Sequence, residues 1–161
     1  MASKATHKYL DNLLEHKALV GRYVQRVISQ LVERVVVHDF SKFGPEELGP
    51  YIAMLPRFAK ADYGSEEYKA CCLAIKPALD HHLANNSHHP EFYPNGVNDM
   101  DLLDVTEMVC DWIAASQRAG GDTLRLDLQR VRFGIDDQLY GIICRTAHAL
   151  TQDDPQFHIV E

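Results

Sequence analysis

The stretch LDNLLEHKALVGRYVQRVISQLVERVVVHD, residues 10–39, decides the fold class. Its apolar residues recur at steps of three and four, the spacing that places side chains on one face of an α-helix. The run Val35–Val37 is β-branched and would also suit a strand, but its position at the end of this pattern favours a helix. We predict one long helix, or two in near continuity, ending close to His38.

Signals for helix starts and ends recur along the rest of the chain. Pro45 and the two acids after it are typical of a first helical turn, Ser65 and Asn98 are suitable N-caps, and Pro77 predicts a kink or a break. We expect further helices from residue 45 onward and over residues 65–84, 98–118, 123–132 and 136–151. The sequence therefore predicts an all-α fold: a single domain over residues 1–161, built of six or seven helices, with a polar tail from about residue 153.

The composition is that of an ordinary globular domain, because 46% of the 161 residues are hydrophobic and 24% are charged. The net charge of -7 leaves no broad basic surface for duplex nucleic acid, although it is compatible with a local basic pocket for a small phosphate compound. No apolar run approaches the roughly 20 residues needed to cross a bilayer. The four cysteines form no CxxC pair, as is typical of reduced thiols rather than of a zinc ribbon. We therefore expect a cytoplasmic protein that binds neither duplex nucleic acid nor a membrane.

The segment HDFSKF, residues 38–43, is the sharpest chemical feature. His38 offers an imidazole nitrogen and Asp39 a hard carboxylate oxygen, and the two can ligate one metal from a helix end. Lys42 lies one helical turn further on, where its ammonium group could face a bound phosphate. On the dipeptide alone, a structural role at the C-terminus of the first helix is an equally good interpretation.

Further metal-ligand candidates lie on both sides of this pair. His16 precedes it on the first helical pattern. Asp104, Glu107 and Asp111 are spaced by three and four residues, so they share one side of a predicted helix. Taken singly, each of these acids is more simply explained as part of a solvated face. As a stripe beside a core-facing edge, they are suited to holding a metal or moving a proton.

A cluster of histidines follows at His81, His82, His88 and His89. It spans a predicted helix end and the loop after it, which can bring several rings to one point. Imidazolium groups at such a point would repel one another, unless a metal or a partner keeps the rings neutral. The alternative is a polar surface loop, and we favour binding of a metal or a substrate.

The order of these residues resembles the HD-domain metalloprotein superfamily, whose signature is a His, a His-Asp pair often followed by Lys, and a distant Asp. The segments HDFSKF (38–43), NNSHHPEF (85–92), DLLDVTEMVCDW (101–112) and RFGIDDQL (132–139) also look like an uncharacterised family of phage and bacterial proteins. These resemblances imply an HD-like helical bundle in a bacterial cell or a phage-infected host. The second covers roughly residues 7–147 and implies no substrate.

The resemblance to the superfamily also implies a ligand set. His16, His38, Asp39 and Asp111 would hold a divalent transition metal (Mn, Co, Ni, Zn or Fe), with Asp104 as the competing choice for the last ligand. Members with two metals carry additional histidines between the pair and the last Asp. Because His82 and His88–His89 are closer together here than in those members, they either hold a second ion or contact substrate.

The sequence is compatible with three functions. The first is a metal-dependent phosphohydrolase for a nucleotide or similar small phosphate ester, in which Lys42 offsets phosphoryl charge and Glu107 or Asp104 moves a proton. The second is a di-iron oxygenase, a class also found in the superfamily. The third is a non-catalytic module that binds a nucleotide or a protein, and the sequence leaves homo-oligomerisation undecided.

Overall fold

The computed structural model describes residues 3–62, 64–118 and 121–161. The chain divides into two compact units, residues 1–37 and 38–161. Seven α-helices and one two-stranded sheet lie within the described residues, so the predicted all-α class is confirmed. The first unit is a single helix, α1 (Lys4–Val37), which includes the three valines at its end. In the described part of the chain, no helix is both long and apolar enough to cross a membrane.

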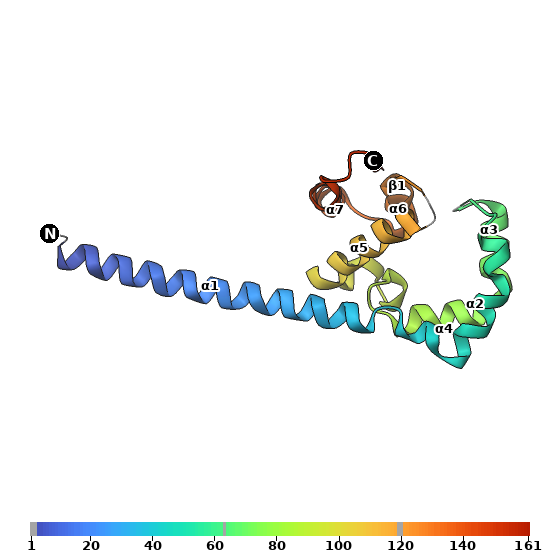
Figure 1. Cartoon of the computed structure of the whole chain (residues 1–161), viewed down its shortest axis with the longest axis horizontal. Helices are drawn as coiled ribbons and strands as arrows, with labels where there is room; N and C mark the ends of the chain where they lie inside the picture. Colours follow the sequence, from blue (N-terminus) through green and yellow to red (C-terminus); the bar gives the residue numbers. More distant parts are fainter. Residues whose placement is uncertain (1–2, 63, 119–120) are drawn as a thin grey trace. The chain divides into compact units, whose positions relative to one another are not determined.

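The second unit contains the other six α-helices of the described chain (Figure 1). They are α2 (Pro45–Phe58), α3 (Glu66–Ala74), α4 (Lys76–Asn85), α5 (Leu102–Arg118), α6 (Leu126–Phe133) and α7 (Asp137–Thr151). Short 3-10 helices form η1 (Phe40–Phe43), η2 (Pro90–Phe92) and η3 (Gly96–Asp99), and the strands are β1 (Thr123–Arg125) and β2 (His158–Val160). Helix α2 contacts α4, and α5 contacts α7.

The helix boundaries follow local signals in most places. The Ser65 hydroxyl accepts the backbone N–H of Tyr68, as expected of an N-cap. The expected interruption near Pro77 is a complete break between α3 and α4. The prediction that Asn98 caps the next helix is wrong, because Asn98 lies in η3. The N-terminus of α5 is capped by Asp101 instead: its Oδ1 atom accepts the backbone N–H of Leu103 at 2.7 Å and that of Asp104 at 2.9 Å.

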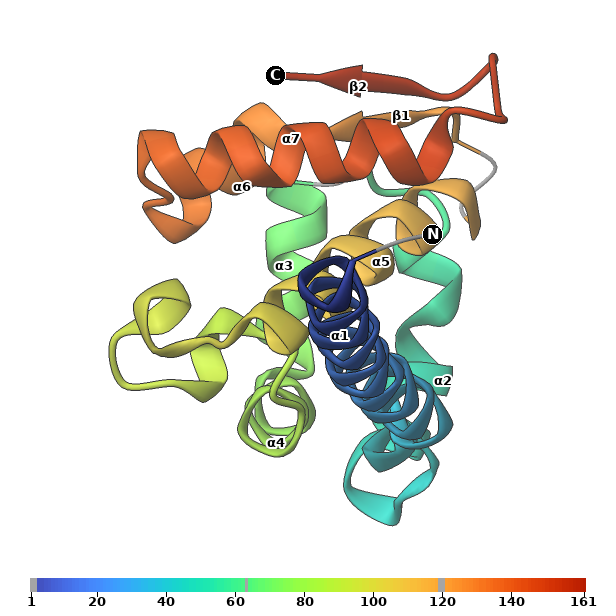
Figure 2. The same cartoon turned by 90° about the vertical axis from the view of Figure 1, so that its left-hand side faces the viewer.

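The region after α5 differs from the expected helix over residues 123–132. Residues 123–125 form β1, which pairs in parallel with β2 from the C-terminal tail, and only from Leu126 does the chain become helical (Figure 2). The C-terminal tail also differs from the expected polar segment, because it contributes the buried side chain of Phe157. Pairing between segments so far apart in the sequence leaves no local pattern, so the sequence does not predict these strands.

The interior of the second unit consists of an apolar region and a region with buried polar side chains. Side chains from α5, β1, α6, α7 and the tail form an apolar core that includes Met108, Trp112, Leu126, Ile143 and Phe157. Around α2 and α4, by contrast, the buried side chains include four polar ones, namely Glu47, His82, Asn86 and His88. Because burying polar groups is costly unless they are paired, this second region is the candidate for function.

Candidate metal centre

Asp39 stands in an unusual backbone conformation between residue 37 and η1. Its φ of 57° and ψ of 16° place it in the left-handed region, the only such non-glycine residue in the described chain. Aspartate tolerates this region better than most side chains, because its short carboxylate is small and polar. Backbone strain of this kind tends to persist where the surrounding structure needs the side chain in one position.

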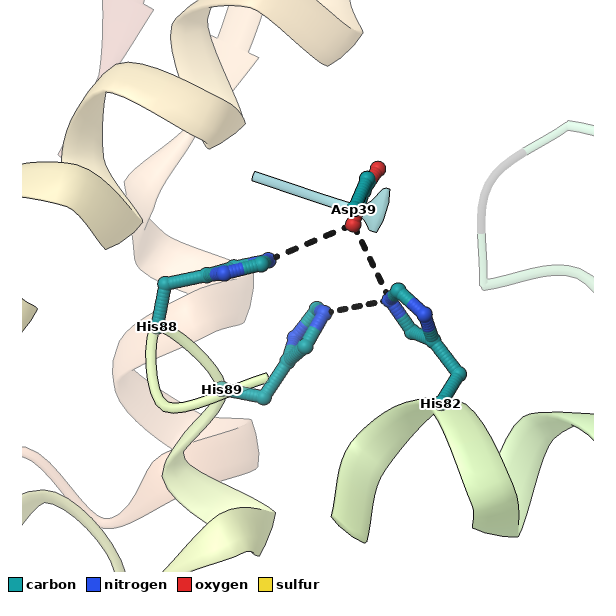
Figure 3. Close-up of side chains that lie close together, drawn as sticks. All are labelled: Asp39, His82, His88 and His89. Carbon is teal, nitrogen blue, oxygen red and sulfur yellow. Dashed lines mark hydrogen bonds and ion pairs between the residues drawn. The ribbon is translucent and has the colours of Figure 1, made fainter. Parts of the chain in front are cut away.

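The Asp39 carboxylate meets three imidazole rings at one point (Figure 3). Its Oδ1 atom lies 3.2 Å from Nε2 of His82 and 3.6 Å from Nε2 of His88. The Nε2 atoms of His82 and His89 are 2.9 Å apart. One ligand atom from each of these four residues, which we call the Asp39 group, lies within 4.8 Å of all the others.

The Asp39 group fits a transition-metal ion. Ligands at the roughly 2.0–2.1 Å of Zn–N and Zn–O bonds lie about 3.3 Å apart in a tetrahedral site, and the three separations above bracket that value. Oδ1 of Asp39 and Nε2 of His88 are buried and form no hydrogen bond, although both point into the group. Three imidazole nitrogens with one carboxylate oxygen suit Zn, Fe, Co, Ni or Mn better than Ca or Mg.

Local structure explains how the rings are brought together. His82 lies in the last turn of α4, and His88 and His89 lie in the loop that leads to η2. Asn86, at the C-cap of α4, donates to the backbone carbonyl of His82 at 2.7 Å and to the Ser41 hydroxyl at 2.8 Å. This buried amide therefore connects the end of α4 to η1, beside Asp39.

The protonation states suit metal binding. Burial lowers the pKa of His89 and, together with the nearby rings of His88 and His82, brings it to about 3. The pKa of His88 is also lowered, chiefly by burial and then by His38. Burial would raise the pKa of Asp39, but the close approach of the His82 ring and the hydrogen bond and charge of Lys42 bring it well below its usual range. Near neutral pH, the group thus presents neutral His88 and His89 rings and an ionised carboxylate, the forms that ligate metals.

A second set of potential ligands, His38, His88 and Glu107, adjoins the first and shares His88 with it. Oε1 of Glu107 accepts a hydrogen bond from Nδ1 of His38 at 2.8 Å and lies 3.4 Å from Nδ1 of His88. Nε2 of His38 is 3.5 Å from Asp111 and 3.7 Å from Asp39. Asp111 and then Glu107 raise the pKa of His38 to about 9 against the opposing effect of burial. His38 is therefore a cation between acids in this arrangement.

The structure brings most of the predicted site residues together. His38, Asp39, Asp111, Glu107, His82, His88 and His89 all belong to the two adjoining sets or contact them. Nζ of Lys42 donates to Oδ2 of Asp39 at 2.5 Å, so its first partner is the proposed ligand rather than open solvent. His16 lies in α1, within the first unit, and its ligand role stays a prediction.

Asp104 is placed differently from the other acids of the stripe. It is 3% exposed, and its Oδ2 atom accepts the backbone N–H of Asp101 at the start of α5. In the described residues, neither set of convergent ligand atoms includes Asp104 or Asp111, but Asp111 lies 3.5 Å from Nε2 of His38, a member of the second set. Between the two alternatives left open by the sequence, the geometry therefore favours Asp111 over Asp104.

Glu47 is the site residue that the sequence did not reveal. It lies in the first turn of α2, where an acid is expected simply to favour the helix dipole. Its side chain is nevertheless 0% exposed, and its two oxygens face Nδ1 of His81 at 2.7 Å and Nδ1 of His82 at 3.0 Å. Nothing in the local pattern separates it from exposed Glu46, because its burial comes from packing against α4.

Comparison with known proteins identifies a family that the chain matches. A protein-family model described as a family of unknown function (DUF5662) matches residues 5–149. No curated protein matches the chain, and no solved structure does. The matched range includes every residue of both ligand sets.

Proposed function

The chain belongs to the DUF5662 family, whose function is unknown, and we propose that it is a metal-dependent phosphohydrolase acting on a nucleotide or similar small phosphate ester. One observation carries the proposal: Oδ1 of Asp39 converges with the Nε2 atoms of His82, His88 and His89, and two of these buried atoms have no hydrogen-bond partner. Buried acceptors without donors are costly, and a bound cation would satisfy them together.

The charge balance supports a cation at this point. Four carboxylates, those of Asp39, Glu47, Glu107 and Asp111, lie in or beside the two ligand sets. The cations nearby are Lys42 and the His38 imidazolium. A divalent ion at the Asp39 group would offset the excess of negative charge, and a second ion in the adjoining set would have to displace the proton from His38.

Phosphate-ester chemistry is supported by what borders the ligand atoms. A divalent metal, when bound, would activate water and offset charge on phosphoryl oxygens. Lys42 and His38 are both partly exposed beside Asp39, at 37% and 26% of their side-chain area, so each can reach an anionic substrate. The hydrogen-bonded pair of His38 and Glu107 is suited to holding and transferring a proton.

The first test is elemental analysis of the purified wild-type protein beside an Asp39→Ala variant, followed by a screen for phosphate released from nucleotides. We expect stoichiometric transition metal and turnover in the wild type and neither in the variant. An Asp80→Ala variant is the matched control, because Asp80 pairs with Lys76 on the exposed side of α4. Full metal content and full turnover in Asp39→Ala would contradict the assignment.

A di-iron oxygenase is the second candidate, favoured by the two adjoining ligand sets that share His88. Two irons per chain with an oxygen-dependent change in the absorption spectrum would support it over hydrolysis. A colourless protein with one Zn or Mn per chain would exclude it. Saturable nucleotide binding without any product would instead support a binding module.

A further inference from the structure

We infer that Glu47 is a positioning residue that fixes His82 with Nδ1 protonated and with Nε2 directed into the Asp39 group. Oε2 of Glu47 lies 3.0 Å from Nδ1 of His82, while Nε2 on the other side of the same ring faces Asp39 and His89. The inference rests on metal binding at the Asp39 group, as proposed above, and does not require that the protein hydrolyse phosphate esters.

The burial of Glu47 is what calls for an explanation. Its side chain is 0% exposed, and a carboxylate without water around it must be compensated by hydrogen-bond donors. Both donors available here are imidazole groups, Nδ1 of His81 and Nδ1 of His82. A carboxylate accepts only, so His82 must carry its proton on Nδ1 to satisfy this contact. The Asn86 amide nitrogen also lies 3.1 Å from Nδ1, but its two protons are directed to the closer His82 carbonyl and Ser41 hydroxyl.

That choice of proton position determines what Nε2 can do. A neutral imidazole with a proton on Nδ1 has a lone pair on Nε2, which is the atom a metal binds. The carboxylate also fixes the rotation of the ring and makes its free nitrogen more basic, as outer carboxylates commonly do for metal-binding histidines. Packing reinforces the orientation, because the ring of Tyr51 meets that of His82 edge-on with centroids 6.3 Å apart.

Glu47 is suited to this role in a way that its neighbour is not. Glu46 occupies the same helical turn of α2 and is exposed, whereas Glu47 points toward α4 and reaches His82. His81, which is 36% exposed, holds the other carboxylate oxygen and so keeps the Glu47 side chain in one rotamer. Of the two histidines at the end of α4, His81 therefore holds the Glu47 carboxylate in place, and His82 is positioned by that carboxylate.

The experiment uses the full chain loaded with Zn²⁺, which is colourless and diamagnetic. Long-range ¹H–¹⁵N spectra report which ring nitrogen of His82 carries the proton, and a competition titration with a chelator gives the zinc dissociation constant. We expect a proton on Nδ1 in the wild type. In Glu47→Gln we expect loss of this single protonation pattern and a zinc affinity weaker by about 10- to 100-fold.

Glu46→Gln is the matched control and should leave both measurements unchanged. The inference is overturned if zinc-loaded wild type carries the proton of His82 on Nε2, a result that needs no variant to fold. It is equally overturned if folded Glu47→Gln binds zinc as tightly as wild type. Zinc bound as expected but with no phosphate ester hydrolysed would overturn the proposed function alone, and no zinc bound to wild type would overturn both.

Discussion

His82 and His89 present their Nε2 atoms to each other at a separation of 2.9 Å. Two neutral imidazole nitrogens at this distance repel through their lone pairs unless one carries a proton or both bind the same ion. A proton shared by these two rings would still leave Oδ1 of Asp39 and Nε2 of His88 without hydrogen bonds. A metal ion accounts for all four atoms at once.

The histidine pair gives the first prediction. His82→Gln and His89→Gln should each weaken zinc binding by more than the roughly 10- to 100-fold that follows loss of an outer hydrogen bond, because each removes a ligand. Calorimetric titration of the metal-free protein measures the change. His148→Gln is the control, since His148 is exposed and pairs with Glu161. Equal affinity in all three variants would exclude the Asp39 group as the binding site.

Much of this site can be predicted from the sequence, because many of its residues are close to one another in the chain. His38 and Asp39 are adjacent, His88 and His89 are adjacent, and the acids of α5 recur with the helical period, so each part could be found by inspection. The helices were also predictable from periodicity and caps such as Ser65. What brings these parts to one point, the left-handed turn at Asp39 and the buried amide of Asn86, had no such signal.

The errors share one physical cause, which is that they depend on long-range packing. Glu47 looks like any acid at a helix start until α4 covers it. The strand at residues 123–125 exists because residues 158–160 pair with it. Asp101 rather than Asn98 caps α5, because η3 occupies the four residues before Met100 and delays the start of the helix.

The acids of α5 should separate into structural and functional roles. Asp104→Ala should lower the free energy of unfolding by about 1 kcal/mol or more, as loss of a helix-start hydrogen bond does, and keep the metal. Asp111→Ala should reduce metal content or turnover, because Oδ1 of Asp111 lies 3.5 Å from Nε2 of His38, a member of the second ligand set. Denaturant unfolding and elemental analysis of both variants decide this. Metal loss in Asp104→Ala alone would reverse the assignment.

Phe157 should contribute to stability although it lies in a tail that the sequence indicated to be polar. Its ring is 9% exposed and belongs to the apolar core with Leu126 and Ile143. Phe157→Ala should therefore cost about 3 kcal/mol of unfolding free energy, as expected for an aromatic ring removed from a core. Gln156→Ala, which changes an exposed neighbour, should cost much less. Equal stability of the two variants in urea would show that the tail does not pack as described.

The pH dependence of stability follows from His38. Its folded pKa of about 9 lies above the ordinary value of 6.5, so protonation favours the folded state. The stabilisation is complete below pH 6.5 and is lost as the pH rises through 9, which amounts to at most about 3 kcal/mol. Chelator-treated wild type should therefore lose unfolding free energy over this window more steeply than His38→Gln, which cannot gain the proton. Parallel curves for the two proteins would mean that Asp111 and Glu107 do not hold His38 as a cation.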